Sequence, residues 1–435
     1  MQFNFPPIDI PVEGLDKVKL PKMYSITQRY DDQRVEDISG HLAAQLESQI
    51  GNKEGFIGKS IALTVGSRGI PHLDVMAKTI CDQLKNWGAA PFIVPSMGSH
   101  GGATAEGQIE MLAGYNITEQ SIGVPIKSCM DVVQYDALDD GTPLYCDKNA
   151  WSADGIVVFN KVKPHTDFRG AHESGLAKMI AIGLAKHKGA SMFHMKGFAC
   201  FPDVLPVIAE KFIKKGPQLM FGVGVVQNAY DEVCNIDVCP KEGIIKMDAD
   251  LLVVAKGKMP RFKFQECDVL VIDEIGKNIS GNGHDPNIVG RNNSGDFPEV
   301  FTLKRLVILG ITPESHHNAA GINLADITTR GLLNDVDWRA TWINVLTANR
   351  PNGGKIPVYA ETDRDAVIMA IRTGDNVDFE HPRVAHIKNT LCMTKIDVSE
   401  AIYNEIKDRG DVSLISGPFE LDFNADGRLT PLEEA

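Results

Sequence analysis

Short β-branched apolar runs alternate with glycine-rich polar turns along the first part of the chain. Three of these runs, 60–65, 91–94 and 156–159, are typical of buried strands. The first is followed by the turn 66–69 and the second by the turn 97–104, and a helix is expected after each turn. Two strand–turn–helix units in succession predict a parallel sheet with short right-handed crossovers.

Helical spacing and further apolar runs predict the remaining elements. Ile38, Leu42, Leu46 and Ile50 recur at intervals of four and indicate an amphipathic helix over 35–50. Short β pieces are expected over 122–145, with a hairpin turn at Asp140-Gly141. Further strands are expected at 220–226, 268–272, 305–309 and 356–359, and further helices at 174–186, 204–214, 248–256, 335–347 and from 363 onward.

This pattern predicts the α/β class, with two α/β domains and a cofactor cleft between them. A chain of 435 residues is too long for one compact core. The basic segment 257–264 is interpreted as an interdomain link. We therefore expect an N-terminal catalytic and cofactor domain over 1–262, starting with an irregular or β arm, and a C-terminal domain over 263–435. In this prediction the last helix and the C-terminal tail can pack back on the N-terminal domain.

Charge and composition narrow the partners. The net charge of −13 argues against nucleic acid or an anionic membrane as a partner. No apolar run is long enough to cross a bilayer, and the N-terminus lacks the features of a signal peptide. The eight cysteines are scattered without a CxxC pair, which favours reduced thiols in a cytoplasmic protein. We expect a small-molecule substrate, and the oligomeric state stays open.

Two of the turns could bind an anion. His100 lies in the turn GSHGGAT, where Gly101 and Gly102 let a phosphate or carboxylate approach backbone amides before a helix. Arg68, in the turn after the preceding strand, would face the same crevice and could clamp an oxyanion. The alternative is that these turns simply require glycine and carry a surface histidine and arginine.

The stretch 157–197 carries the densest candidate chemistry. His165 follows Pro164, which fixes the backbone before a group suited to acid–base work. Lys178 lies in an apolar helical segment, which favours its neutral, nucleophilic form. His194 closes the stretch. The alternatives are structural histidines and a lysine that extends to solvent.

The second half of the chain offers weaker candidates. Lys277, His284 and Arg291 lie in or near a glycine-rich loop after an expected strand and could cover the cleft. The loop 314–318 has metal-ligand residue types, although adjacent histidines rarely chelate one ion. The tail Asp422 to Glu433 matches an EF-hand calcium loop at nearly every ligand position, but it lacks the exit helix and a second loop.

Together these residues resemble the nickel-pincer nucleotide-dependent lactate racemase family, over roughly the whole chain. The resemblance implies that two α/β domains enclose a pyridinium mononucleotide with two thio-acyl arms, one of them joined to a lysine as a thioamide. Nickel is then held by the pincer and one histidine, and two further histidines act as acid–base groups during hydride transfer.

Residue by residue, the family's motifs map onto this sequence. The glycine-turn histidine corresponds to His100, the histidine of the PH pair to His165, the tethering lysine to Lys178 after Ser174-Gly175, and the nickel ligand to His194. Arg68 corresponds to the arginine after the first strand, and Lys277 to the cleft lysine. The sequence departs from the family in a longer loop that carries His172 and Glu173, and in the missing tyrosine–glutamine segment before the cleft lysine.

The resemblance implies an isomerase that racemises or epimerises a 2-hydroxy acid. His100, His165 and Lys277 would be catalytic, while Lys178, Arg68, Ser174, Gly101 and Gly102 would bind the cofactor. Two alternatives stay open. One is a metal-dependent hydrolase or lyase that uses His165, His194 and a carboxylate such as Asp167 or Glu173, and the other is a non-catalytic anion-binding protein.

Overall fold

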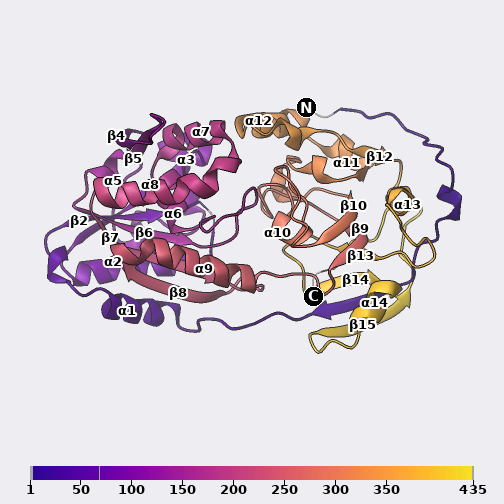
Figure 1. Cartoon of the computed structure of the whole chain (residues 1–435), viewed down its shortest axis with the longest axis horizontal. Coiled ribbons are helices and arrows are strands. Elements are labelled where there is room, and N and C mark those ends of the chain that lie inside the picture. Colours follow the sequence, from indigo (N-terminus) through magenta and orange to yellow (C-terminus); the bar gives the residue numbers. More distant parts are fainter. Residues whose placement is uncertain (1–2, 68, 434–435) are drawn as a thin grey trace. The chain divides into compact units, whose positions relative to one another are not determined.

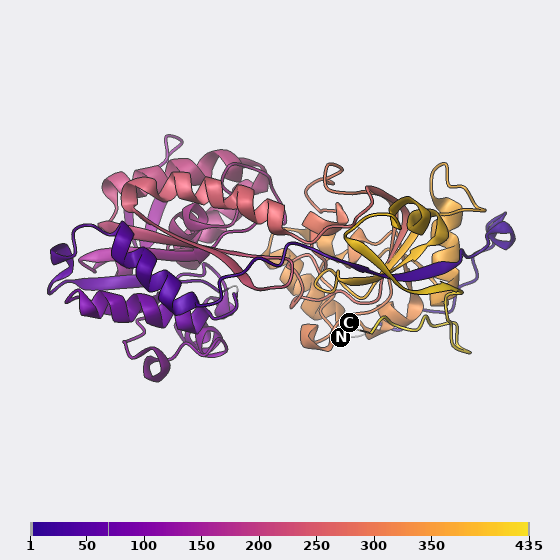
Figure 2. The same cartoon turned by 90° about the horizontal axis from the view of Figure 1, so that it is seen from below.

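The structure is a computed structural model that describes residues 3–67 and 69–433. The chain divides into two compact units (Figures 1 and 2). Asp31–Met259 forms one unit, and the N-terminal arm up to Tyr30 joins the chain from Pro260 onward in the other. Both units combine helices with a central sheet, so the predicted α/β class is confirmed. The cofactor cleft stays a prediction.

The 31–259 unit is built on a five-stranded sheet in the order β3-β2-β6-β7-β8. Strands β3, β2, β6 and β7 are parallel, as the two strand–turn–helix units predicted, and β8 is antiparallel to β7. Parallel strands covered on both faces are buried along most of their length. Their bounds are β2 Ser60–Val65, β3 Ala90–Pro95, β6 Gly155–Lys161, β7 Leu219–Gln227 and β8 Val233–Pro240.

Alternate side chains of each strand point to opposite faces and build two separate cores. On β2, Ile61 and Leu63 pack under helices α1 and α2, whereas Ala62 packs against α8 and α9 on the other face. The helices are α1 Ile38–Gln49, α2 Leu73–Asn86, α3 Ala105–Ala113, α4 Glu119–Ile122, α5 Lys148–Trp151, α8 Phe201–Lys215 and α9 Ile244–Lys258. The expected hairpin forms from β4 Val132–Ala137 and β5 Pro143–Asp147.

The stretch predicted as one helix over 174–186 is instead divided. It contains a single α-helical turn, α6 Leu176–Lys178, followed by a π-helix over Met179–Gly183. Lys186 then adopts a φ of +53°, and α7 Lys186–Lys196 begins there. Apolar periodicity could not separate these pieces, because nearly every position in them is buried.

The other unit contains an eight-stranded sheet in the order β12-β11-β10-β9-β13-β14-β1-β15. The first five strands of this order are parallel, and β14, β1 and β15 are antiparallel to their neighbours. Their bounds are β1 Met23–Gln28, β9 Glu266–Ile272, β10 Thr302–Ile308, β11 Ile327–Thr329, β12 Val358–Ala360, β13 Val384–Ile387, β14 Lys395–Ser399 and β15 Val412–Phe419.

The N-terminal arm therefore departs from the expected 1–262 boundary. β1 pairs with β14 and β15, so the arm completes the sheet of the other unit. The C-terminal tail stays in this same unit, where the backbone N–H of Leu432 donates to Asp273. Strand pairing across almost 400 residues leaves no trace in local sequence, which is why the arm was assigned to the wrong side.

Helices α10 Pro286–Val289, α11 Arg330–Asp335, α12 Trp338–Thr347, α13 Asp363–Thr373 and α14 Glu400–Ile406 complete this unit. The eight cysteines all lie in the described part of the chain and are free thiols. Across residues 3–67 and 69–433, no helix has both the length and the apolarity needed to cross a membrane.

Candidate functional site

Three turns at the carboxyl ends of β2, β3 and β6 meet around the π-helix. Gly66, after β2, faces the end of the Met179 side chain, and a Cβ at Gly66 would lie 3.2 Å from it. Gly98, after β3, donates its N–H to the carbonyl of Gly183 at 3.4 Å. Asn160, at the end of β6, donates to the carbonyl of Gly175 at 2.8 Å. Loops beyond the carboxyl ends of parallel strands are where α/β folds bind ligands.

His100 lies at the surface of this edge, in the turn before α3. Its Nδ1 hydrogen bonds with the hydroxyl of Ser67, from the turn after β2. Gly101 and Gly102 both have positive φ, +65° and +64°. A Cβ on Gly101 would come within 2.6 Å of the Gly107 backbone, whereas a Cβ on Gly102 would meet no atom of the described residues within 4 Å. Gly101 is thus required for packing, and Gly102 leaves the turn open to a ligand.

His165 is held in a loop that begins directly after β6. Its backbone N–H donates to the Glu173 carboxylate at 2.8 Å, and its carbonyl accepts from Arg169 at 2.9 Å. Its Nδ1 accepts the backbone N–H of Asp167 at 3.0 Å, so in the neutral ring the proton resides on Nε2. The Asp167 carboxylate lies 3.8 Å from the same Nδ1 and can balance the imidazolium once the ring is protonated.

His165 and His194 are brought together by an aromatic cluster of Phe168, Phe198 and Phe201. The His165 ring stacks on Phe168 at 4.3 Å between centroids, and lies 5.5 Å from Phe198. His194, on α7, lies 5.4 Å from the same Phe198. Sequence spacing alone did not point to Phe198, which connects the two histidines.

Lys178 is half-buried at the last position of α6, directly before the π-helix. A π-helical insertion widens the turn and occurs frequently at functional sites. Ser174 pairs through its backbone with Lys163, closing the loop that carries His165. The lysine, the His165 loop and the glycine turns therefore share one edge of the sheet.

His172 and Glu173, the extra residues of the loop, are buried and hydrogen bond to other parts of the protein. They therefore do not belong to an open ligand surface. His172 contacts Asp248 at 2.9 Å, and Asp248 also accepts the backbone N–H of Leu176 at the start of α6. Glu173 accepts from the backbone of His165 and Gly170 and from Lys256 at 2.6 Å. Because its oxygens are engaged in this way, Glu173 is a poor metal ligand for the hydrolase alternative.

A buried cation that the sequence did not reveal lies beneath the His100 turn. The Lys186 side chain has no exposed area, and it pairs with Asp147 at 3.2 Å and with Gln108 at 2.9 Å. Burial lowers the pKa of Lys186 and raises the pKa of Asp147. The sequence did not reveal this group because a lysine after an apolar run usually indicates only the end of a helix. Its partners, Asp147 and Gln108, lie 39 and 78 residues earlier in the chain.

The remaining sequence candidates lie elsewhere. Arg68 falls outside the described residues. Lys277 belongs to the other unit, where its N–H donates to Ser315 and its Nζ to the carbonyl of Gly281. Arg291 there pairs with Asp326. Burial lowers the pKa of His284 to about 4, so this ring is neutral. The role of Lys277 stays a prediction.

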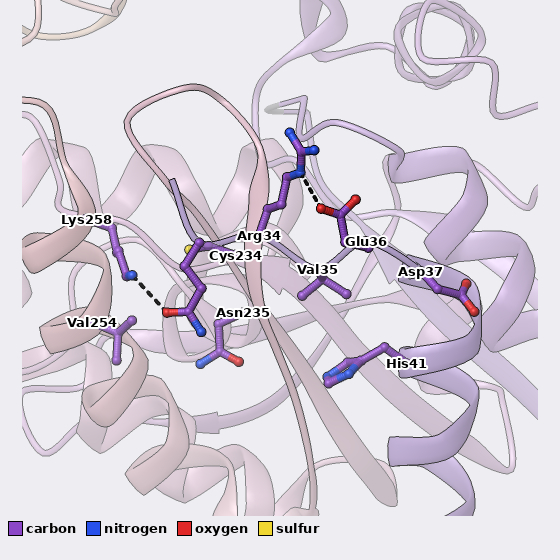
Figure 3. A pocket seen from close by; sticks show the side chains of 10 residues that line it. Arg34, Val35, Glu36, Asp37, His41, Cys234, Asn235, Val254 and Lys258 are labelled. Carbon is purple, nitrogen blue, oxygen red and sulfur yellow. Dashed lines mark hydrogen bonds and ion pairs between the residues drawn. The ribbon is translucent and has the colours of Figure 1, made fainter. Parts of the chain in front are cut away.

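A pocket of about 580 Å³ opens elsewhere on the 31–259 unit, at the start of β8 (Figure 3). It is lined by residues of α1, β8 and α9 and of the segment before α1, and by none of the predicted site residues. Its cations are already balanced, since Arg34 pairs with Glu36 and Glu232, and Lys258 with Asp31. We assign it no ligand.

The described residues at this edge do not form a ready-made cluster of metal ligands. In the part of the chain that the structure describes, no three or more His, Cys, Asp or Glu side chains group closely enough to hold a metal ion. The loop of the tail is a small hairpin in which Phe423 bridges Leu429, and Thr430 donates to Asp422. Calcium binding between Asp422 and Glu433 stays a prediction.

Comparison with known families relates the segment that contains this edge to a known domain. Residues 59–201 match the sequence model of the lactate racemase N-terminal domain. The resemblance to the lactate racemase family is confirmed. The matched segment of this lactate racemase-like chain contains His100, His165, Lys178 and His194, and also the buried Lys186.

Two solved structures are similar to the chain at low identity. One is the lactate racemase apoprotein from Thermoanaerobacterium thermosaccharolyticum, with 15% identity and a TM-score of 0.45, covering 80% of this chain and 85% of that one. The other is a protein from Thermotoga maritima solved by the Northeast Structural Genomics Consortium, with 14% identity and a TM-score of 0.48, covering 75% and 84%. No curated protein sequence matches the chain.

Proposed function

We propose that this lactate racemase-like protein racemises or epimerises a 2-hydroxy acid with a nickel-pincer nucleotide. The observation that best supports the proposal is the shared contact of His165 and His194 with Phe198. Lys178 lies on the same sheet edge, beside the π-helix on which the glycine turns pack. The nucleotide would be tethered to Lys178, and its nickel would be held by His194.

The residues present fit such a group. The His194 ring is partly exposed beside Phe198 and Phe201, and a neutral imidazole is the most common protein ligand for metals of this kind. Backbone amides at the Gly101–Gly102 turn can receive a phosphate, with Ser174 and Arg68 as further proposed contacts. When bound, the group supplies an acceptor for the hydride from the substrate Cα.

His100 and His165 are the proposed acid–base pair. Ser67 holds the Nδ1 of His100, which makes Nε2 the atom that exchanges a proton with the substrate hydroxyl. For His165 to accept a proton at Nε2, its neutral ring must carry a proton on Nδ1, so Nδ1 has to exchange the Asp167 N–H for the Asp167 carboxylate, which lies 3.8 Å away. A racemase needs a base for each face of the substrate, because each must serve both directions of the reaction. Lys277 is the proposed partner of the substrate carboxylate.

A panel of 2-hydroxy acids, sugar acids included, tests the reaction. Protein made together with the cofactor-producing enzymes should invert one substrate at Cα and should keep a deuterium label on that carbon, since hydride leaves and returns. His100→Ala and His165→Ala should each slow inversion by about 10²–10⁴-fold. His187→Ala, which removes an exposed histidine of α7, should not. Loss of the label to water, or activity restored by zinc alone, would contradict the proposal.

A further inference from the structure

We infer that Lys186, Asp147 and Gln108 are positioning residues that hold the His100 turn against the segment carrying Lys178 and His194. The inference rests on the proposed function, because it concerns the same site. None of the three side chains is exposed, so none of them can contact a substrate from solvent. Their effect must pass through the backbone that they bind.

Lys186 occupies the junction between the two pieces of chain that matter most. It follows the π-helix that starts after Lys178, and it begins α7, which carries His194 eight residues later. Its positive φ of +53° redirects the chain at this point. Any force that fixes Lys186 therefore fixes the relative position of the proposed tether and the proposed nickel ligand.

The Lys186 ammonium group reaches from this junction to the end of β3. It donates to the carbonyl of Pro95, the last residue of that strand, and to Gln108 Oε1 at 2.9 Å. Gln108, on α3, then donates through Nε2 to the carbonyls of Gly98 at 3.1 Å and His100 at 3.3 Å. One continuous set of hydrogen bonds thus joins Lys186 to the backbone of the proposed base.

Asp147 completes the network from a third side. It pairs with Lys186 at 3.2 Å, accepts the N–H of Ala150 at 2.9 Å, and donates its own N–H to the carbonyl of Leu184. The β5–α5 corner is thereby bound to the same junction.

Stability alone does not account for a buried ion pair. Desolvation of the two charges offsets most of their attraction, and well-packed apolar residues often replace such pairs without loss. An apolar side chain cannot donate N–H groups to Pro95 and Gln108, however. The property that requires a lysine here is therefore the directional link to the His100 turn.

Two variants break this link in different ways. Gln108→Leu removes the bridge to Gly98 and His100 but keeps the ion pair. Lys186→Met combined with Asp147→Leu removes both charges together, which proteins commonly tolerate. Lys188→Met is the matched control, because this lysine of α7 is exposed and its ammonium group lies over the Tyr145 ring, 4.6 Å from the ring centroid.

The first measurement is hydrogen exchange in the full-length protein without cofactor, read on the amides of Gly98, His100, Ala103 and Thr104. Exchange should become at least about tenfold faster in both variants and stay unchanged in the control. The second is steady-state kinetics of loaded protein. There kcat should fall about 10²-fold with KM little changed, as expected for a misplaced base, while the adduct at Lys178 forms normally.

Unchanged exchange in both variants, or wild-type kcat in either, would overturn the inference. If the wild-type protein forms no adduct and turns over no 2-hydroxy acid, the proposed function fails, and hydrogen exchange still decides whether the network holds the turn.

Discussion

Removal of the Glu173 carboxylate tests whether the His165 loop is held from within the protein. The side chain has no exposed area. One oxygen accepts the backbone N–H of His165 at 2.8 Å, and the other accepts Gly170 N–H at 3.2 Å and Lys256 Nζ at 2.6 Å. Glu173→Ala deletes all three bonds, whereas Glu173→Gln keeps the shape and directs an amide group toward the donors.

The expected loss of stability in Glu173→Ala depends on whether each former partner of the carboxylate can bind water instead. Lys256 is about one-third exposed and can turn to water, so its loss contributes little. The N–H groups of His165 and Gly170 lose their acceptor in a partly buried loop, at about 1–3 kcal/mol each. Glu173→Ala should therefore lower the free energy of unfolding of the 31–259 unit by about 2–6 kcal/mol, and Glu173→Gln by about half as much.

Hydrogen exchange in increasing urea, read on the β6 amides, reports the unfolding of this unit separately from the other. Glu210→Ala is the control, because Glu210 is exposed on α8 and lies 3.8 Å from Lys214, and it should cost less than about 0.5 kcal/mol. A loss below about 1 kcal/mol for Glu173→Ala, together with loss of a bound metal, would refute this structural role and favour Glu173 as a ligand.

Two further predictions concern buried polar groups. Asp248→Ala removes the acceptor of the Leu176 N–H at the start of α6 and the partner of His172, so it should lower the free energy of unfolding by about 2–4 kcal/mol in the same exchange experiment; a loss no larger than that of exposed Asp250→Ala would contradict this. For His284, burial lowers the pKa in the folded protein to about 4 from 6.5. Between these two pH values the unfolded chain binds a proton at His284 and the folded protein does not. The free energy of unfolding therefore falls by about 3 kcal/mol as the pH drops from 6.5 toward 4. Urea denaturation of wild type and His284→Gln across this range should show the steeper fall in wild type, and parallel profiles would exclude the effect.

The local sequence pattern predicted the strands and turns of the 31–259 unit, because each of these elements depends on residues that are next to one another in the chain. The β-branched runs of β2, β3 and β6 and the glycines after them predicted the edge on which His100 and Lys178 lie. Features that depend on distant partners were not predictable in this way. From the sequence Glu173 was a candidate carboxylate for a metal-dependent reaction, and only the fold shows that Lys256, 83 residues later, binds this carboxylate.

The same limit explains the other departures. The role of Lys186 could not be predicted, because it depends on its contacts with Asp147 and Gln108, which are distant in the sequence. The pairing of β1 could not be predicted either, because the other strands of its sheet lie far along the chain. The π-helix after Lys178 is set by packing on every side, which erases the periodicity that would identify it.

Intact mass and nickel content of the purified protein test the central claim most directly. Protein produced with the cofactor-making enzymes should carry a covalent adduct at Lys178 and about one nickel per chain, and protein produced without them should carry neither. Lys178→Ala should lose the adduct, and His194→Ala should keep the adduct while losing most of the nickel. An adduct that persists in Lys178→Ala, or a wild-type protein that stays unmodified and nickel-free under these conditions, would contradict the account.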